Sequence, residues 1–152
     1  MLLDCGSRDL KFVRFDKGQV ADMGWNTECG ASMGFTIELL AAYYRLDYAT
    51  MRVPQSSFSV TCGVLGMSQI FDAVIAGASE EEAVACFVRG IARNAWRFAG
   101  SPDRLHLSGG LCDNPLFLAC LPCEVQPLGR FVLLEGLKES LPDGSPALHQ
   151  GH

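Results

Sequence analysis

The chain has 152 residues, a length typical of one domain and too short for two domains with full cores. Twelve lysines and arginines against 17 aspartates and glutamates give a formal net charge of −5, which argues against nucleic acid as the main partner. With 49% apolar and 19% charged residues, the composition is that of a folded domain. No apolar run approaches the roughly 20 residues needed to cross a bilayer, and the first residues lack the pattern of a secretion signal. We therefore expect a cytoplasmic protein with no membrane association.

The start of the chain is predicted to form an antiparallel meander. Short apolar runs separated by turn residues predict strands over residues 1–5, 11–15 and 19–23. Gly6-Ser7-Arg8-Asp9 ends the first strand, and Asp16-Lys17-Gly18 has the composition of a hairpin turn. The first turn is thus a small loop that contains glycine.

Helices alternate with strands in the rest of the chain. Ser79 and Glu82 have the spacing of a capping box, and apolar residues follow at helical spacing. The pattern predicts helices over 35–44, 64–76, 80–98, 115–120 and 129–139, and strands over 104–108 and 123–126. This order predicts a single α/β domain over 1–139, a mixed sheet with helices on its faces, followed by a flexible tail over 140–152.

Seven cysteines are many for a chain without an export signal, and an odd number argues for buried thiols plus a metal or redox site. Cys29 and Cys62 each lie in a loop just before a predicted helix, where the positive helix end favours the thiolate that binds metal. Two ligands do not close a site, but two chains about a two-fold axis would supply the four thiolates of a 4Fe-4S cluster. Two inert buried thiols and a zinc site are the alternatives.

Cys120-Leu-Pro-Cys123 has the CxxC spacing of redox and metal sites. A single such pair at the end of a short apolar helix is more typical of cysteines in a core. Cys5 and Cys86 are also expected in the core.

Four motifs follow one another in an order that resembles a known family. They are Leu3-Asp4-Cys5-Gly6-Ser7-Arg8-Asp9-Leu10-Lys11, Asn26-Thr27-Glu28-Cys29-Gly30-Ala31, Thr61-Cys62 and Leu107-Ser108-Gly109-Gly110-Leu111-Cys112-Asp113-Asn114. Together they resemble the 2-hydroxyacyl-CoA dehydratase activases, the BadF/BadG/BcrA/BcrD type of ATPase in the actin, sugar kinase and heat-shock chaperone superfamily. The resemblance covers about residues 1–137 and implies a ribonuclease H-like, actin-like ATPase fold.

The resemblance extends to the second half of a family member only. Such proteins clamp a nucleotide between two ribonuclease H-like halves, and the loop with the first phosphate motif has no counterpart in this sequence. The chain is accordingly expected to be a natural half-sized relative or a fragment.

The resemblance assigns ATP or ADP with magnesium to two glycine-containing loops. Asp4, Gly6, Ser7 and Asp9 match the second phosphate loop, where backbone amides face phosphate oxygens and an acid faces the metal ion. An acidic hairpin turn is the alternative. The adenosine motif is matched by Gly109, Gly110 and Asn114. A tight strand-to-helix turn capped by Asn114 is an alternative that is compatible with this role.

Cys29 and Cys62 stand at the positions of the family's cluster ligands. The resemblance implies a homodimer that bridges one 4Fe-4S cluster and donates electrons to a dehydratase or reductase partner. ATP binding and hydrolysis are expected to be impaired, or to depend on a protein that supplies the missing lobe. The alternative is a non-catalytic structural or nucleotide-binding module of the same fold.

Overall fold

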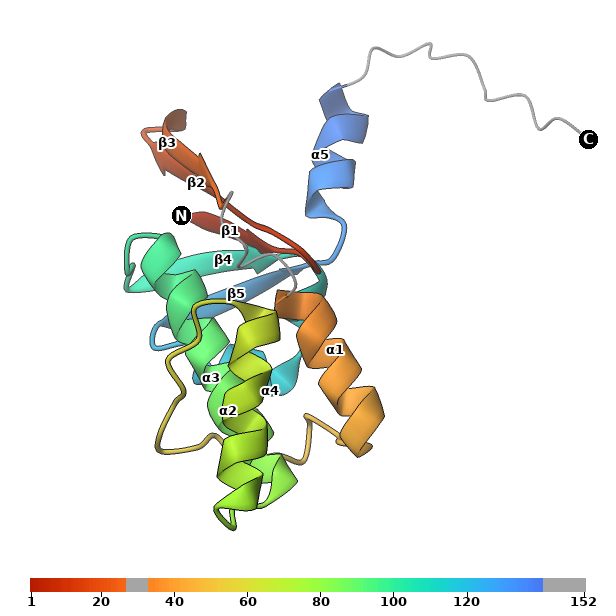
Figure 1. The fold of residues 1–152 in the computed structure, drawn as a ribbon. Coiled ribbons are helices and arrows are strands. Elements are labelled where there is room, and N and C mark those ends of the chain that lie inside the picture. Colours follow the sequence, from red (N-terminus) through yellow and green to blue (C-terminus); the bar gives the residue numbers. More distant parts are fainter. Residues whose placement is uncertain (27–32, 141–152) are drawn as a thin grey trace, which may run out of the picture.

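A computed structural model describes residues 1–26 and 33–140 of the chain. Cys29 and residues 141–152 of the expected tail lie outside this part. The described strands form one five-stranded mixed sheet in the order β3-β2-β1-β4-β5 (Figure 1). The strands are β1 Leu2–Cys5, β2 Leu10–Asp16, β3 Gln19–Trp25, β4 Arg104–Ser108 and β5 Glu124–Gly129. The helices are α1 Met33–Tyr44, α2 Gly63–Ile75, α3 Glu80–Phe98, η1 Gly110–Asp113, α4 Pro115–Cys120 and α5 Val132–Ser140. The prediction of an α/β domain with a mixed sheet is confirmed.

Strand β1 lies at the centre of the sheet and changes its direction of pairing. It pairs antiparallel with β2 and parallel with β4, and β4 pairs parallel with β5. Asp4 near the end of β1 is in register with Ser108 at the end of β4. The carboxyl ends of these two strands therefore meet at one edge of the sheet, where ligands of open α/β sheets commonly bind.

The predicted hairpin turn between β2 and β3 is confirmed, and it has two residues, because Asp16 already pairs with Gln19. Lys17 and Gly18 have φ angles of 49° and 78°, the combination that a type I′ turn requires at its two central residues. Strand β3 continues to Trp25, two residues beyond the predicted end, because Trp25 still pairs with Lys11. Every residue of β3 is exposed or only half-buried, so this strand adds little to the core.

Helix α3 organises the helical part of the domain and packs against α1, α2 and α4. The predicted cap is confirmed, since the Ser79 hydroxyl accepts a 3.1 Å hydrogen bond from the Glu82 N–H. Phe87, Val88 and Ile91 are fully buried, in one core with Leu3 and Leu107 of the sheet. The core thus joins α3 to the two central parallel strands.

The loop of residues 54–60 runs along α3 and leads to the start of α2. Hydrogen bonds fix it to α3: the Phe58 N–H donates to the Cys86 carbonyl at 3.1 Å, the Arg89 side chain donates to the Pro54 carbonyl, and the Asn94 side chain donates to the Val60 carbonyl. A Cβ atom on Gly90 would lie 2.5 Å from the Phe58 carbonyl oxygen. Only glycine therefore allows this close approach of loop and helix.

Helix α5 extends away from the rest of the domain (Figure 1), and none of its residues is buried. Its exposed apolar side chains are those of Leu133, Leu134 and Leu137. Among the helices described, none is long and apolar enough to cross a membrane.

Candidate functional site

The centre of the candidate site is a buried carboxyl group at the carboxyl ends of β1 and β4. Asp4 is 8% exposed, and its Oδ2 accepts a 2.6 Å hydrogen bond from the hydroxyl of Ser108, which is fully buried. A bond of this length to a carboxylate belongs to the strong, charge-assisted class. Asp4 is therefore held at the sheet edge in a fixed orientation by the neighbouring parallel strand.

The predicted phosphate loop follows Asp4 as a tight turn. The Gly6 N–H donates to the Asp9 carbonyl at 3.0 Å, and the Ser7 carbonyl accepts from the Phe35 N–H of α1 at 3.0 Å. A Cβ atom on Gly34 would lie 2.7 Å from the Gly6 carbonyl oxygen, so α1 begins in direct contact with this loop. The loop is thereby enclosed between the sheet edge and the first turn of α1.

The Asp9 carboxylate is occupied by partners on the hairpin. Its Oδ2 accepts from Lys11 Nζ at 2.7 Å and from the Trp25 indole N–H at 3.1 Å, and the Lys11 ammonium lies 5.4 Å from the centre of the Trp25 ring. A magnesium ion at Asp9 would have to compete with the Lys11 ammonium. Of the two acids proposed for this loop, only Asp4 lacks a basic partner in the described ion pairs.

The two glycines of the predicted adenosine motif have different roles in the structure. Gly109 has a φ of 88°, and a Cβ atom there would lie 2.4 Å from the Cys5 carbonyl oxygen, so glycine is required for packing against β1. Gly110 is different, because a Cβ atom at this position would meet nothing within 4 Å. Gly110 faces an open pocket.

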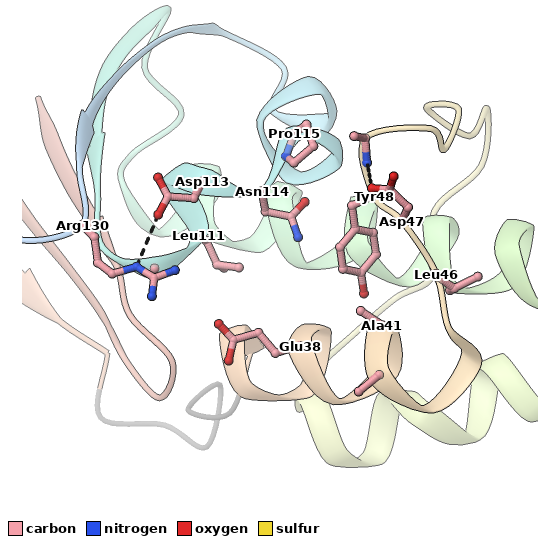
Figure 2. Close-up of a pocket in the computed structure, with 13 residues that line it drawn as sticks. Glu38, Ala41, Leu46, Asp47, Tyr48, Leu111, Asp113, Asn114, Pro115 and Arg130 are labelled. Carbon is pink, nitrogen blue, oxygen red and sulfur yellow. Dashed lines mark hydrogen bonds and ion pairs between the residues drawn. The ribbon is translucent and has the colours of Figure 1, made fainter.

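This pocket has a volume of about 590 Å³ and lies between α1, the loop that follows α1, and the start of α4 (Figure 2). Its size is within the range of small-molecule and cofactor sites. Figure 2 shows the Glu38 side chain pointing from α1 into the space below the Asp113–Arg130 ion pair, in which Arg130 Nε lies 3.3 Å from Asp113 Oδ2. Leu46 and Leu111 contribute apolar surface to the walls of the pocket.

Asn114 both caps a helix and lines the pocket. Its Oδ1 accepts the Phe117 N–H at 2.9 Å, which confirms the predicted cap of α4. The NH₂ group of the same amide remains as a donor toward a ligand in the pocket. The pocket thus offers carboxylates that accept hydrogen bonds from hydroxyl groups, an amide donor and apolar walls, a combination suited to a nucleoside.

Tyr48 stabilises the far wall of the pocket. Its hydroxyl donates a 2.6 Å hydrogen bond to the Ile37 carbonyl, and burial raises the pKa of Tyr48 above its ordinary value. The phenol therefore stays protonated and keeps the loop after α1 attached to that helix. No sequence motif marks Tyr48, Glu38 or Arg130 as pocket residues, because the fold brings them beside the Gly110 motif from distant segments.

Cys62 lies at the N-cap of α2, half-buried, and makes no side-chain capping hydrogen bond to that helix. Helices α1 and α2 begin at the same end of the helical layer and run in the same direction (Figure 1). Cys29 precedes the first residue of α1 by four positions and lies outside the described residues. Within 1–26 and 33–140, no group of three or more metal-ligating side chains gathers into a site.

The other cysteines of the described segments are placed mainly in the core. Cys5, Cys86, Cys112 and Cys120 are buried, and burial raises the pKa of Cys120 to about 11. Burial also raises the pKa of Cys123. Both CxxC thiols therefore stay protonated at neutral pH, as a thiol in a core does.

No protein-family model and no curated protein matches the chain. Among solved structures, it is similar to the activator of the 2-hydroxyisocaproyl-CoA dehydratase from Clostridium difficile with bound ADPNP, with a TM-score of 0.65 and 17% identity over 95% of this chain. It is also similar to component A of the (R)-2-hydroxyglutaryl-CoA dehydratase from Acidaminococcus fermentans, with a TM-score of 0.66 and 18% identity over 83% of this chain. The chain spans 64% and 54% of the lengths of these two proteins. It therefore has the fold of these two proteins over part of their length.

Proposed function

We propose that the chain is an activase-like iron–sulfur protein. Two copies bridge one 4Fe-4S cluster through Cys29 and Cys62 and donate electrons to an acyl-CoA dehydratase or a related reductase. A nucleotide binds in the pocket beside Gly110, and hydrolysis depends on a second lobe from another chain. This proposal rests on the fold shared with two dehydratase activators, one of which was solved with a bound ATP analogue.

The observation that carries the proposal is that α1 and α2 begin at the same end of the helical layer (Figure 1). Cys62 is the N-cap residue of α2, and Cys29 precedes the first residue of α1 by four positions in the sequence. In this proposal, both thiols lie at the positive ends of helices that run in the same direction, where the helix dipole favours the thiolate. Two thiolates per chain require a second chain to complete a four-cysteine shell.

The donor set fits an iron–sulfur cluster better than a hard cation, because thiolates are soft ligands. When bound, such a cluster would supply one low-potential electron at a time to the partner enzyme. The residues of this chain would hold it in place: Cys62 is the N-cap residue of α2, and hydrogen bonds between α3 and the loop of residues 54–60 fix the segment before it. The alternative is a zinc ion bound by the same four thiolates, and metal analysis distinguishes zinc from iron.

Anaerobic purification followed by iron, sulfide and zinc analysis tests this proposal. We expect about four irons and four sulfides per dimer, with a broad visible absorption band. The Cys29→Ser/Cys62→Ser variant is expected to lose the iron, the sulfide and the absorption band, whereas the Cys120→Ser/Cys123→Ser variant keeps all three. Metal-free wild-type protein, or metal that depends on the CxxC pair, would overturn the assignment.

Nucleotide binding without cluster chemistry is a second candidate, favoured by the pocket at Gly110. In this case Glu38 and Asn114 bind the nucleoside, and Asp4, Gly6 and Ser7 face the phosphates. The Gly110→Val variant would fill part of the pocket, yet the position has space for a Cβ atom. Calorimetry with ADP is expected to show binding to the wild type and at least about tenfold weaker binding to this variant. Equal affinities would exclude this pocket as the nucleotide site.

A further inference from the structure

A second polar pocket lies on α3, formed with the loop of residues 54–60. It has a volume of about 200 Å³, and its lining residues are Ser57, Phe58, Ser59, Gly90, Arg93, Asn94 and Arg97. None of these residues lines the pocket beside Gly110. The hydrogen bonds to the Cys86 and Val60 carbonyls and the close contact at Gly90 hold its two walls together. The pocket is therefore a preformed feature of the domain.

The pocket carries two positive charges and no acidic lining residue. Arg93 and Arg97 are four positions apart on α3, where like charges repel each other on a helix surface. Arg93 Nη1 reaches the Ser57 hydroxyl at 3.4 Å, and neither arginine takes part in an ion pair of the described residues. In a chain of net charge −5, this pair is a local concentration of uncompensated positive charge.

We infer that this pocket binds a phosphate group through Arg93 and Arg97. The planar guanidinium fork matches the oxygen geometry of phosphate, and two forks balance the charge of a dianion. The Ser57 hydroxyl adds a donor on the opposite wall. The volume leaves room for more than a bare ion, so both free phosphate and a phosphate monoester fit. This site goes beyond the proposed cluster and nucleotide sites and does not depend on either.

Titration by nuclear magnetic resonance on the metal-free, nucleotide-free full chain tests the inference at constant ionic strength. Inorganic phosphate is expected to shift the Nε–H signals of Arg93 and Arg97 and the amide signals of residues 57–59 in a saturable manner. Glycerol phosphate as a second ligand distinguishes a monoester from the free ion, and saturation by either one supports the site. Acetate at the same ionic strength is expected to give no saturable shift.

The Arg93→Gln/Arg97→Gln variant is expected to bind phosphate at least about tenfold more weakly, because both charge-assisted partners are removed. The Arg14→Gln/Arg104→Gln variant removes the same charge from two exposed ion pairs on the sheet and is expected to bind like the wild type. Shifts that do not saturate, that acetate reproduces, or that persist in the Arg93/Arg97 variant would overturn the inference. Failure here leaves the metal analysis of Cys29 and Cys62 unaffected.

Discussion

Gly109 and Gly110, which are adjacent at the carboxyl end of β4, have different structural roles. Gly109 is fixed by packing, because its φ is positive and the backbone of Cys5 leaves no room for a side chain. Gly110, the next residue, faces the pocket, where a side chain would meet nothing. The glycine pair thus combines a structural requirement at Gly109 with free space at Gly110, so the tight turn and the proposed adenosine motif are compatible.

The Asp4–Ser108 hydrogen bond is expected to contribute measurably to stability. Ser108→Ala would leave the buried Asp4 carboxylate without this donor, and we expect a loss of about 1–3 kcal/mol in the free energy of unfolding. Urea denaturation measures this loss. Ser140→Ala, which removes an exposed serine hydrogen bond on α5, is the matched control and should change stability by less than about 0.5 kcal/mol. Equal effects of the two substitutions would contradict the role given to Ser108.

Because Cys120 is buried, we expect the free energy of unfolding to fall as the pH rises into the alkaline range. Its pKa is about 11 in the folded chain, above the ordinary value of 9.0. The unfolded chain therefore loses this proton at a lower pH than the folded chain does. The contribution of Cys120 to the free energy of unfolding is complete below about pH 9 and is lost as the pH rises toward 11. The difference in unfolding free energy between wild type and Cys120→Ala should therefore shrink by roughly 2 kcal/mol over this range. Urea denaturation of both proteins at several pH values measures the difference. A constant difference would contradict the burial of this thiol.

At the level of elements, the sequence predicts most of the fold. Clear signals such as the capping box at Ser79 and the turn at Lys17-Gly18 predict elements that the structure confirms. The 3₁₀ helix η1 is not indicated by the sequence, because its four residues begin at Gly110, within the glycine turn, and show no periodicity. Strand β3 extends further than expected because pairing with Lys11, and not the composition of β3, determines where it ends.

Fewer features of the candidate site than of the fold can be predicted from the sequence. The glycine motifs indicate the sheet edge correctly, since strand ends and turn residues are local features. Glu38 and Arg130 could not be predicted as pocket residues, because only the tertiary fold brings them beside Gly110. The hydrogen bonds from Lys11 and Trp25 to the Asp9 carboxylate likewise depend on the register of the hairpin, which the sequence does not reveal.

The close contact between α3 and the loop of residues 54–60 is expected to be sensitive to a single methyl group. Gly90→Ala would place a Cβ atom 2.5 Å from the Phe58 carbonyl, which is incompatible with the observed packing. We expect a loss of about 1–3 kcal/mol in unfolding free energy. Gly136→Ala on α5 meets nothing within 4 Å and should be neutral or stabilising by up to about 1 kcal/mol. Thermal unfolding compares the two, and equal stabilities would contradict the contact.

At the level of the whole molecule, we propose that the described domain forms one wall of a nucleotide site. The pocket beside Gly110 is lined by residues of helices and loops, and the chain spans 64% and 54% of the lengths of the two similar solved structures. We therefore expect ADP binding without efficient hydrolysis by the 152-residue chain. Release of phosphate from ATP with magnesium measures this. Robust turnover by the purified chain would contradict the proposed need for a second lobe.

The central claim is that two chains share one cluster, and anaerobic native mass spectrometry tests it most directly. The account predicts a dimer whose mass exceeds that of two chains by one 4Fe-4S cluster, with Cys29→Ser/Cys62→Ser giving cluster-free protein. The Cys120→Ser/Cys123→Ser control should retain the loaded dimer. A cluster bound to a single chain, or a dimer of unchanged mass that persists without Cys29 and Cys62, would contradict the account.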